Sequence, residues 1–298
     1  MFVKRLPRFE YFEPSSVREA LEVLRAHRGQ CSLIAGGTDL LVSMKKRERV
    51  PAHLVNLKGI DELKGIHYDD NKGLRIGSLA TLVEIADERV VEEACPMLKD
   101  AAEVMAAPQI RSLGTIGGNL CSASPSADTA PPLIASGASV RIIGPQGERE
   151  LPVEEFFRGP GESVLEDTEI LSHIFIPAPP GNSGTAYLKL MRRGAMDLAI
   201  VGVAVYLERG GETDLCKRAC IALGAVAPTP MRALRAEEVL RDKKIDKALT
   251  REAGRIASEE SRPIDDVRAS EAYRRSMVEV LTQRAIMKAL DRIGTKAS

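Results

Sequence analysis

Tryptophan is absent from this sequence of 298 residues, and aromatic residues make up only 4% of it. Proteins that bind single-stranded nucleic acid stack the bases on aromatic side chains, so a chain with so few rings is a poor candidate for that class. A net charge is also lacking, because 42 Lys and Arg residues balance 42 Asp and Glu residues. Without a positive field, we expect neither nucleic acid nor an anionic membrane surface as a partner.

Long apolar runs and a disulfide framework are missing too. No run approaches the roughly 20 apolar residues that cross a bilayer, and the first residues are not followed by the apolar core of a signal peptide. The five cysteines are scattered and odd in number, which argues against structural disulfides. The four histidines share no metal-ligand spacing with one another or with the cysteines. We expect a cytoplasmic protein with no metal site and no membrane span.

Two segments rich in glycine and small polar residues stand out instead. The first is 35–40, Ala-Gly-Gly-Thr-Asp-Leu, and the second is 109–128, which contains Thr-Ile-Gly-Gly-Asn and ends at an aspartate. Each Gly-Gly pair alone is more typical of a turn than of a binding site. Glycine permits φ > 0 and close approach to the backbone, and consecutive N–H groups form a concave anion site. Two such segments together predict a diphosphate that is bound between them.

The context of the first segment supports a phosphate site. An apolar run at 31–35 predicts a strand, and 39–46 predicts a helix, so the glycines precede a helix N-terminus, whose partial positive charge favours phosphate. The sequence has neither Gly-x-Gly-x-x-Gly nor Gly-x-x-x-x-Gly-Lys-Ser/Thr. The predicted site is therefore neither a Rossmann nor a Walker phosphate loop.

Three regions follow from the order of the predicted elements. Residues 1–59 predict a β-α-β unit, and 60–177 predict a second α/β unit with a Gly/Pro-rich link at 144–147. A turn-rich run then marks a boundary. The third region, 183–293, predicts a three-stranded sheet followed by helices, with strands at 186–191, 199–208 and 216–223 and helices at 231–241, 246–261 and 270–291.

The motifs at 35–40, 115–119 and 124–132 resemble those of the FAD-binding (medium) subunit of the molybdenum hydroxylases. That family includes aerobic carbon monoxide dehydrogenase, xanthine dehydrogenase and nicotinate dehydrogenase. Residues 266–275, Asp-Val-Arg-Ala-Ser-Glu-Ala-Tyr-Arg-Arg, resemble its C-terminal flavoprotein domain. The resemblance implies an α+β fold. Two α/β subdomains of the p-cresol methylhydroxylase/vanillyl-alcohol oxidase type would bind FAD, and a βββ-plus-helices domain would follow them.

The resemblance also implies which residues bind FAD. The first segment would contribute Leu33, Ile34, Ala35, Gly36, Gly37, Thr38, Asp39 and Leu40. The second segment and its surroundings would contribute Met105, Ile110, Gly114, Thr115, Ile116, Gly117, Gly118, Asn119, Ser122 and Asp128. Leu171 and Lys189 complete the expected set, and no catalytic side chain and no metal ligand is expected.

Two of these assignments have simpler alternatives. Asp128 would accept a hydrogen bond from a flavin sugar hydroxyl, but it could equally cap the helix that follows. Lys189 would lie near the isoalloxazine and tune its electron affinity, whereas a strand lysine is ordinarily solvated. The residues alone leave both alternatives open.

As a member of this family, the chain would be an oxidoreductase subunit in a heterotrimer, or in a dimer of heterotrimers. A large partner would carry molybdopterin, and a small partner would carry two [2Fe–2S] clusters. Electrons would pass from these clusters through FAD to NAD, a quinone or O2.

Two alternatives remain open from the sequence. One is a self-contained FAD-dependent oxidoreductase of the same fold with its own organic substrate, which the scarcity of aromatic residues in the last third disfavours. The other is a non-enzymatic module that binds a nucleotide. A visible flavin spectrum would exclude the second alternative.

Overall fold

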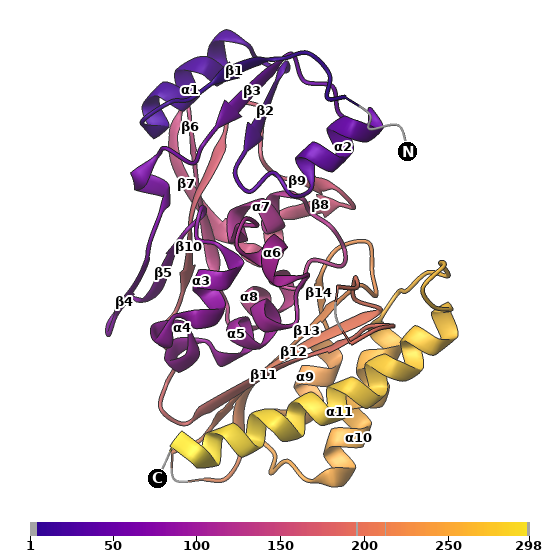
Figure 1. Cartoon of the computed structure of the whole chain (residues 1–298). Helices are drawn as coiled ribbons and strands as arrows, with labels where there is room; N and C mark the ends of the chain where they lie inside the picture. The colour runs from indigo at the N-terminus through magenta and orange to yellow at the C-terminus, as the bar shows by residue number, and fades with distance from the viewer. Residues whose placement is uncertain (1–4, 195, 212, 297–298) are drawn as a thin grey trace.

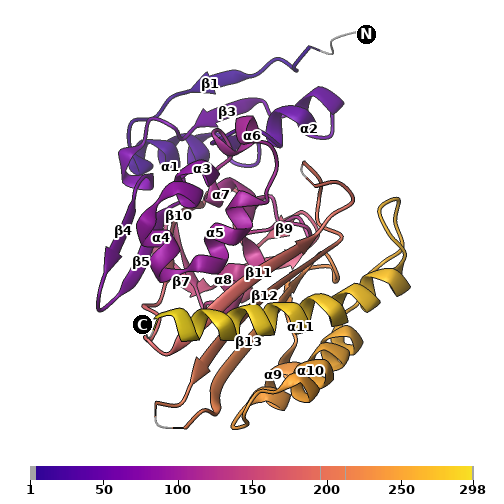
Figure 2. The same ribbon diagram turned by 60° about the horizontal axis from the view of Figure 1, so that its bottom comes forward.

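The computed structural model describes residues 5–194, 196–211 and 213–296. Figures 1 and 2 show the N-terminal and central parts of the chain lying on one side of a long antiparallel sheet, with the C-terminal helices on the other side. Helix and strand are mixed throughout, as expected. None of the helices in the described residues combines the length and the apolar character needed to cross a membrane.

The N-terminal unit is a small parallel sheet in the order β1-β3-β2. Its elements are β1 (Glu10–Phe12), α1 (Val17–Ala26), β2 (Cys31–Ile34), α2 (Leu40–Lys46) and β3 (His53–Asn56). The hydroxyl of Ser16 caps α1 by accepting a hydrogen bond from the Glu19 N–H at 3.2 Å. Because β2 is parallel to its neighbour, the glycine segment leaves the carboxyl edge of the sheet, where ligands of open parallel sheets bind.

The central unit is an antiparallel sheet, β4-β5-β10-β6-β7, with short helices packed against it. The strands are β4 (Ile66–Asp69), β5 (Gly73–Gly77), β6 (Ser139–Gly144), β7 (Gly147–Pro152) and β10 (Ile170–Ile176), with a separate hairpin of β8 (Phe157–Gly159) and β9 (Glu162–Ser163). The helices are α3 (Leu82–Asp87), α4 (Arg89–Ala94), α5 (Pro96–Glu103), α6 (Pro108–Arg111), α7 (Ile116–Cys121) and α8 (Ala130–Ala135), with 3-10 turns at Asp61–Leu63 and Val153–Glu155.

Two glycine-rich segments of this unit form regular local structure. The Gly/Pro-rich link at 144–147 is a tight hairpin turn that joins β6 to β7, and in it Gly144 pairs with Gly147. The segment 109–128 is not one continuous loop, because α7 forms in its middle. The Thr115 hydroxyl accepts a hydrogen bond from the Gly118 N–H and so caps this helix. A cap three residues before that N–H nucleates a helical turn even in a glycine-rich sequence.

The C-terminal unit is an antiparallel sheet covered on both faces. It contains β11 (Ser183–Leu190), β12 (Val201–Arg209), β13 (Cys216–Gly224), β14 (Met231–Arg232), α9 (Leu234–Leu240), α10 (Lys247–Glu260) and α11 (Glu271–Lys296). The predicted three strands form, and the short β14 adds a fourth strand at the edge. Along β12, Val203 and Val205 pack into the core of the C-terminal helices, whereas Ala204 and Tyr206 pack into the core of the central unit. The sheet thus joins two cores through its alternating faces.

A cluster of charged residues fixes this junction. Asp100 on α5 accepts hydrogen bonds from Arg292 at 2.7 and 2.8 Å and from Lys288 at 3.2 Å, both on α11. It also accepts one from the Tyr187 N–H on β11 at 3.2 Å. Burial acts to raise the pKa of Asp100, but the Arg292 and Lys288 charges outweigh this effect and hold it below its ordinary value. Helix α11 is therefore tied across β11 to the central unit.

Candidate functional site

A cavity of about 650 Å3 lies where the three units meet. Its walls come from the segment after β2, from α6 and α7, from the loop before α8, from the start of β10 and from the segment before β12. All but two of the residues expected to bind FAD line this one cavity. The two exceptions are Ile116, whose side chain is fully buried in the central core, and Lys189. A cavity of this volume is typical of a small-molecule or cofactor site.

The first glycine segment presents free backbone donors to this cavity. Within the described residues, the N–H groups of Gly36, Gly37 and Thr38 donate no hydrogen bond to the protein. Gly37 has a φ of 72°, the left-handed conformation that turns the chain from β2 toward α2. Successive free N–H groups in a turn form a concave anion site. This segment therefore has the chemistry expected for holding a diphosphate.

The second glycine segment does not form the anion site that the sequence predicts. The N–H of Ile116 donates to the Ala80 carbonyl at 2.9 Å, and the N–H of Gly117 donates to the Ser78 carbonyl at 2.9 Å. The N–H of Gly118 donates to the Thr115 hydroxyl at 3.0 Å. Neither glycine adopts a positive φ. Because these donors are already satisfied, the expected pair of anion sites is reduced to one.

Gly117 in the second segment and Gly36 in the first allow close packing of the backbone. A Cβ atom on Gly117 would lie 2.6 Å from Cβ of Ser78, and one on Gly36 would lie only 2.1 Å from the carbonyl oxygen of Leu113. Gly36 and Leu113 belong to the two different segments, so the segments touch each other directly. Absent side chains at these points let the backbone of both segments form one continuous wall of the cavity.

Asp128 is held in a buried polar cluster at the other side of the cavity. Its two oxygens accept hydrogen bonds from the Tyr187 hydroxyl at 2.7 Å and from the Lys189 ammonium at 2.8 Å. The side chains of Lys189 and Asp128 are 1% and 5% exposed. Burial raises the pKa of Asp128 above its ordinary value, against the opposing effect of Lys189 and Tyr187. Burial and the same carboxylate raise the pKa of Tyr187.

These contacts decide between the alternatives for both residues. Asp128 does not cap α8, because Thr129 occupies the N-cap position and Asp128 directs its oxygens to β11. Each of its oxygens accepts one hydrogen bond, and a carboxylate offers about four acceptor positions in all. Capacity for a sugar hydroxyl therefore remains. Lys189 is neither a solvated strand lysine nor part of the cavity wall, since it is buried behind Asp128.

The remaining polar residues of the second segment stabilise the segment itself. The Asn119 side-chain oxygen accepts a hydrogen bond from the Thr129 hydroxyl at 2.6 Å, and the Ser122 hydroxyl donates to the Asn119 carbonyl at 2.8 Å. Both residues line the cavity. Met105, Ile110, Gly114 and Leu171 line it as well, and they supply apolar surface.

Several lining residues were missed by sequence reasoning. The Ser78 hydroxyl is buried and has no hydrogen-bond partner, so it is an orphaned polar atom in the cavity wall. Arg49 is the one basic side chain that lines the cavity within the described ranges. Met196, Asp197 and Leu198 contribute a wall from the C-terminal unit. None of these residues belongs to a glycine-rich motif, so no local signal pointed to them.

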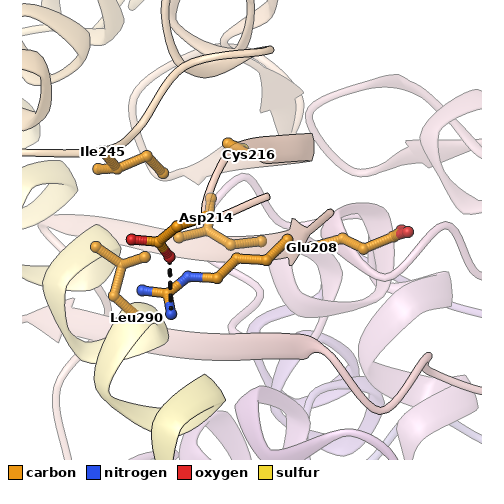
Figure 3. Close-up of a pocket in the computed structure, with 7 residues that line it drawn as sticks. Glu208, Asp214, Cys216, Ile245 and Leu290 are labelled. Atoms are coloured by element: carbon orange, nitrogen blue, oxygen red, sulfur yellow. Dashed lines mark ion pairs between the residues drawn. The ribbon is translucent and has the colours of Figure 1, made fainter. Parts of the chain in front are cut away.

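Two further cavities differ from this one. Arg18, Glu22 and His173 line an open cavity of about 660 Å3 between α1 and the ends of β6 and β10, which contains no expected site residue. The third cavity, shown in Figure 3, lies beside Asp214, Cys216 and Ile245 and measures about 10 Å3. An ion pair between Arg209 and Asp214 spans it at 3.2 Å. That volume holds at most about one water molecule, so it is not a ligand site.

The fold is that of a known class of flavoprotein subunit. Residues 7–179 match the family model of the FAD-binding domain in molybdopterin dehydrogenase, and residues 186–289 match that of the CO dehydrogenase flavoprotein C-terminal domain. The chain belongs to the family of FAD-binding medium subunits of molybdenum hydroxylases. It is thus an oxidoreductase subunit with FAD as its cofactor.

Individual relatives match over nearly their whole length. The carbon monoxide dehydrogenase medium chain of Hydrogenophaga pseudoflava is 35% identical over 284 residues, covering 94% of this chain and 96% of that protein. The xanthine dehydrogenase FAD-binding subunit of Escherichia coli O157:H7 is 32% identical over 289 residues, covering 96% and 97%. These relatives confirm the family predicted from the motifs.

Solved structures confirm the predicted fold. A chain of carbon monoxide dehydrogenase from Hydrogenophaga pseudoflava superposes with a TM-score of 0.93 at 35% identity, covering 97% of this chain and 99% of that one. A chain of quinoline 2-oxidoreductase from Pseudomonas putida 86 has a TM-score of 0.90 at 31% identity, covering 96% and 98%.

The cavity has the polar groups and the volume that FAD would need. The N–H groups of Gly36, Gly37 and Thr38 have no acceptor within the described part of the protein, and the Ser78 hydroxyl has no partner. The cavity of about 650 Å3 is large enough for a cofactor. A bound dinucleotide would satisfy buried polar groups that otherwise cost free energy.

Proposed function

We propose that this chain carries electrons through FAD, from [2Fe–2S] clusters on a small partner subunit to an external acceptor. A large partner subunit with molybdopterin would oxidise the substrate. The observation that carries the proposal is the cavity of about 650 Å3, which combines free backbone donors with apolar surface. The family supports it, because its members include the medium chains of carbon monoxide dehydrogenases. Bound FAD would supply the electron-accepting and electron-donating chemistry.

Within this function, the predicted residues take distinct roles. We assign the diphosphate to the free N–H groups of Gly36, Gly37 and Thr38, with Arg49 as a balancing charge. Asp128 would accept a hydrogen bond from a sugar hydroxyl. Lys189 would act indirectly, by holding the charge and position of that carboxylate at 2.8 Å. The other lining residues would enclose the cofactor and exclude water.

The assembly and the division of the chain belong to the same proposal. We propose FAD-binding subdomains at 1–59 and 60–177 and a C-terminal domain at 183–293, which the sheet composition and the two matched family models support. We also propose a dimer of heterotrimers and NAD as an acceptor. The cytoplasmic location stays a prediction from the sequence.

A purification with the partner subunits tests this proposal. We expect the complex to contain one FAD per copy of this chain, together with iron, sulfide and molybdenum. Reduction of the iron–sulfur clusters should be followed by bleaching of the flavin absorbance and then by its recovery on addition of NAD, a quinone or O2. A flavin that an alcohol or phenol reduces in the isolated chain would instead support a self-contained oxidase. A chain without flavin would contradict both.

A further inference from the structure

The motif Asp266–Arg275 spans the end of the link between α10 and α11 and the first turn of α11, and the function proposed above assigns it no role. Figure 1 shows this link rising at one end of α11, beside the C-terminal sheet. Asp266 holds Arg268 by two hydrogen bonds to one carboxylate oxygen, from Nε at 2.9 Å and from Nη2 at 2.6 Å. Two N–H donors that share one charged acceptor fix the orientation of the guanidinium. The third nitrogen, Nη1, does not contact Asp266 and donates to other residues.

That nitrogen bridges two walls of the cofactor cavity. Arg268 Nη1 donates to the Ser126 hydroxyl at 3.1 Å and to the Ala199 carbonyl at 3.4 Å. Ser126 lies in the loop before α8, which lines the cavity, and Ala199 directly follows Leu198, which also lines it. These two walls come from residues more than 70 positions apart in the chain. Arg268 therefore joins the loop of the FAD-binding part to the wall supplied by the C-terminal unit.

The surrounding contacts reinforce the same junction. Arg274 is 1% exposed and donates to the Ile200 carbonyl at 2.7 Å and the Ala225 carbonyl at 3.0 Å. The Ala225 N–H in turn donates to the Pro125 carbonyl at 2.7 Å. Burial acts to raise the pKa of Asp266, but its hydrogen bonds with Arg268 and Arg274 outweigh this and hold the pKa below its ordinary value. Asp266 is thus ionised at neutral pH and able to orient both arginines.

We propose that Arg268 is a positioning residue for cofactor binding, which sets the separation of the loop at 124–128 from the segment at 196–199 and so the fit of FAD between them. The inference rests on the proposed function, because it concerns the same cavity. Arg268 does not line the cavity. It acts through Ser126 and through the segment that ends at Ala199. The C-terminal unit then contributes directly to FAD retention.

The test uses the full chain in its complex and measures FAD affinity after removal and titration of the cofactor. We expect Arg268→Gln to weaken FAD binding about tenfold, the effect of losing hydrogen bonds from a charged donor. Arg268→Lys should not rescue it, because a single ammonium lacks the planar arrangement of donors that contacts Asp266 and bridges Ser126 and Ala199 together. Ser126→Ala should weaken binding in the same direction while leaving the Arg268–Asp266 pair intact.

A control variant, a spectroscopic measurement and a double variant separate a positioning role from a loss of stability. Arg275→Gln removes an arginine of the same motif that pairs with Glu271 at 3.0 Å, and it should leave FAD affinity unchanged. The visible circular dichroism of bound flavin should change in Arg268→Gln and stay at the wild-type shape in Arg275→Gln. The double variant Arg268→Gln/Ser126→Ala should bind FAD about as weakly as Arg268→Gln alone, since the two residues share one contact.

The outcomes distinguish the inference from the function on which it rests. Wild-type affinity and an unchanged spectrum in both Arg268→Gln and Ser126→Ala would overturn the positioning role alone. Full rescue by Arg268→Lys would also overturn it, since a simple charge would then suffice. A wild-type chain that binds no FAD would overturn the proposed function, and this inference with it. If Arg268→Gln does not fold, Ser126→Ala gives the deciding measurement.

Discussion

The two sides of the cofactor cavity are built by different means. One side consists mainly of backbone and small residues at 35–39 and 114–119. The two segments approach each other because Gly36 has no side chain, and the second approaches Ser78 because Gly117 has none. The other side depends on long side chains of the C-terminal unit, which reach the loop at 124–128: Tyr187, Lys189 and Arg268. On the first side each segment is continuous in sequence, although Gly36 and Leu113, where the two segments touch, are 77 positions apart. The second connects residues 59 to 142 positions apart.

This difference predicts which property, cofactor binding or stability, a substitution on each side should change. A change in the backbone side alters the shape of the cavity and should affect cofactor binding first. A substitution among the long side chains of the C-terminal unit removes a partner from a buried charge. It should first lower the free energy of unfolding, since an unpaired buried charge destabilises the folded protein. The following predictions test that separation.

Removal of the Lys189 ammonium should have the largest effect. Lys189→Met leaves the Asp128 carboxylate buried without its ion partner, so the free energy of unfolding should fall by about 3–5 kcal/mol, as for other broken buried pairs. Urea unfolding of the apo-protein measures this. Lys217→Met is the matched control, because Lys217 forms an ion pair with Glu208 but is 69% exposed. A similar loss in both variants would remove the contrast between the two sides.

A methyl group on the backbone side should act mainly on FAD. Gly36→Ala places a Cβ atom 2.1 Å from the Leu113 carbonyl oxygen and forces the two segments apart. We expect FAD affinity to fall about a hundredfold, corresponding to about 3 kcal/mol. Titration of the apo-protein followed by flavin fluorescence measures this. Gly181→Ala, where no atom lies within 4 Å of the new Cβ, should bind FAD normally.

The junction at Asp100 should contribute in a pH-dependent way. The lowered pKa of Asp100 means that its charged form stabilises the folded protein above the ordinary pKa of 3.8, and that this stabilisation is lost as pH falls through the lowered value. Asp100→Asn should lower the free energy of unfolding by about 2 kcal/mol at neutral pH. The difference from wild type should be constant between about pH 5 and 8 and shrink below about pH 4.

A control at the surface sharpens this result. Glu93 pairs with Arg89 but is 59% exposed, so Glu93→Gln should change the unfolding free energy by less than about 1 kcal/mol. Thermal unfolding of both variants across the pH range gives the comparison. A difference between wild type and Asp100→Asn that persists undiminished at pH 3 would contradict the assignment.

Removal of the Ser78 hydroxyl should have the smallest effect, and it should change FAD affinity and apo-protein stability in different directions. The hydroxyl is buried and has no partner in the protein, so Ser78→Ala should leave the apo-protein as stable as wild type or slightly more stable. If FAD is its partner, affinity should fall by about 1 kcal/mol, or roughly fivefold. Calorimetric titration checks the affinity, and thermal unfolding of the apo-protein checks the stability. Unchanged affinity would show that FAD does not use this hydroxyl.

Much of the secondary structure could be read from local patterns. Ser16 and Glu19 have the spacing of a helix cap, and they form one. The alternating apolar residues of β12 predicted its strand, although the fact that both of its faces are covered is a tertiary property. The second glycine segment was misjudged, because glycine pairs permit an anion site but do not show whether the N–H groups already have acceptors. Ser78 and Ala80, whose carbonyls accept hydrogen bonds from Gly117 and Ile116, precede those residues by 39 and 36 positions.

The sequence by itself determined the family, the broad order of the elements and 18 of the 34 residues that line the cavity, because motifs and apolar periodicity are local and depend on a few adjacent positions. The tertiary structure decided which backbone donors stay free, where the Lys189 charge goes and which arginine joins the two walls. Those properties depend on partners distant in the chain. Hydrogen bonds and burial are set by proximity in space, which only the packed sheets and helices establish.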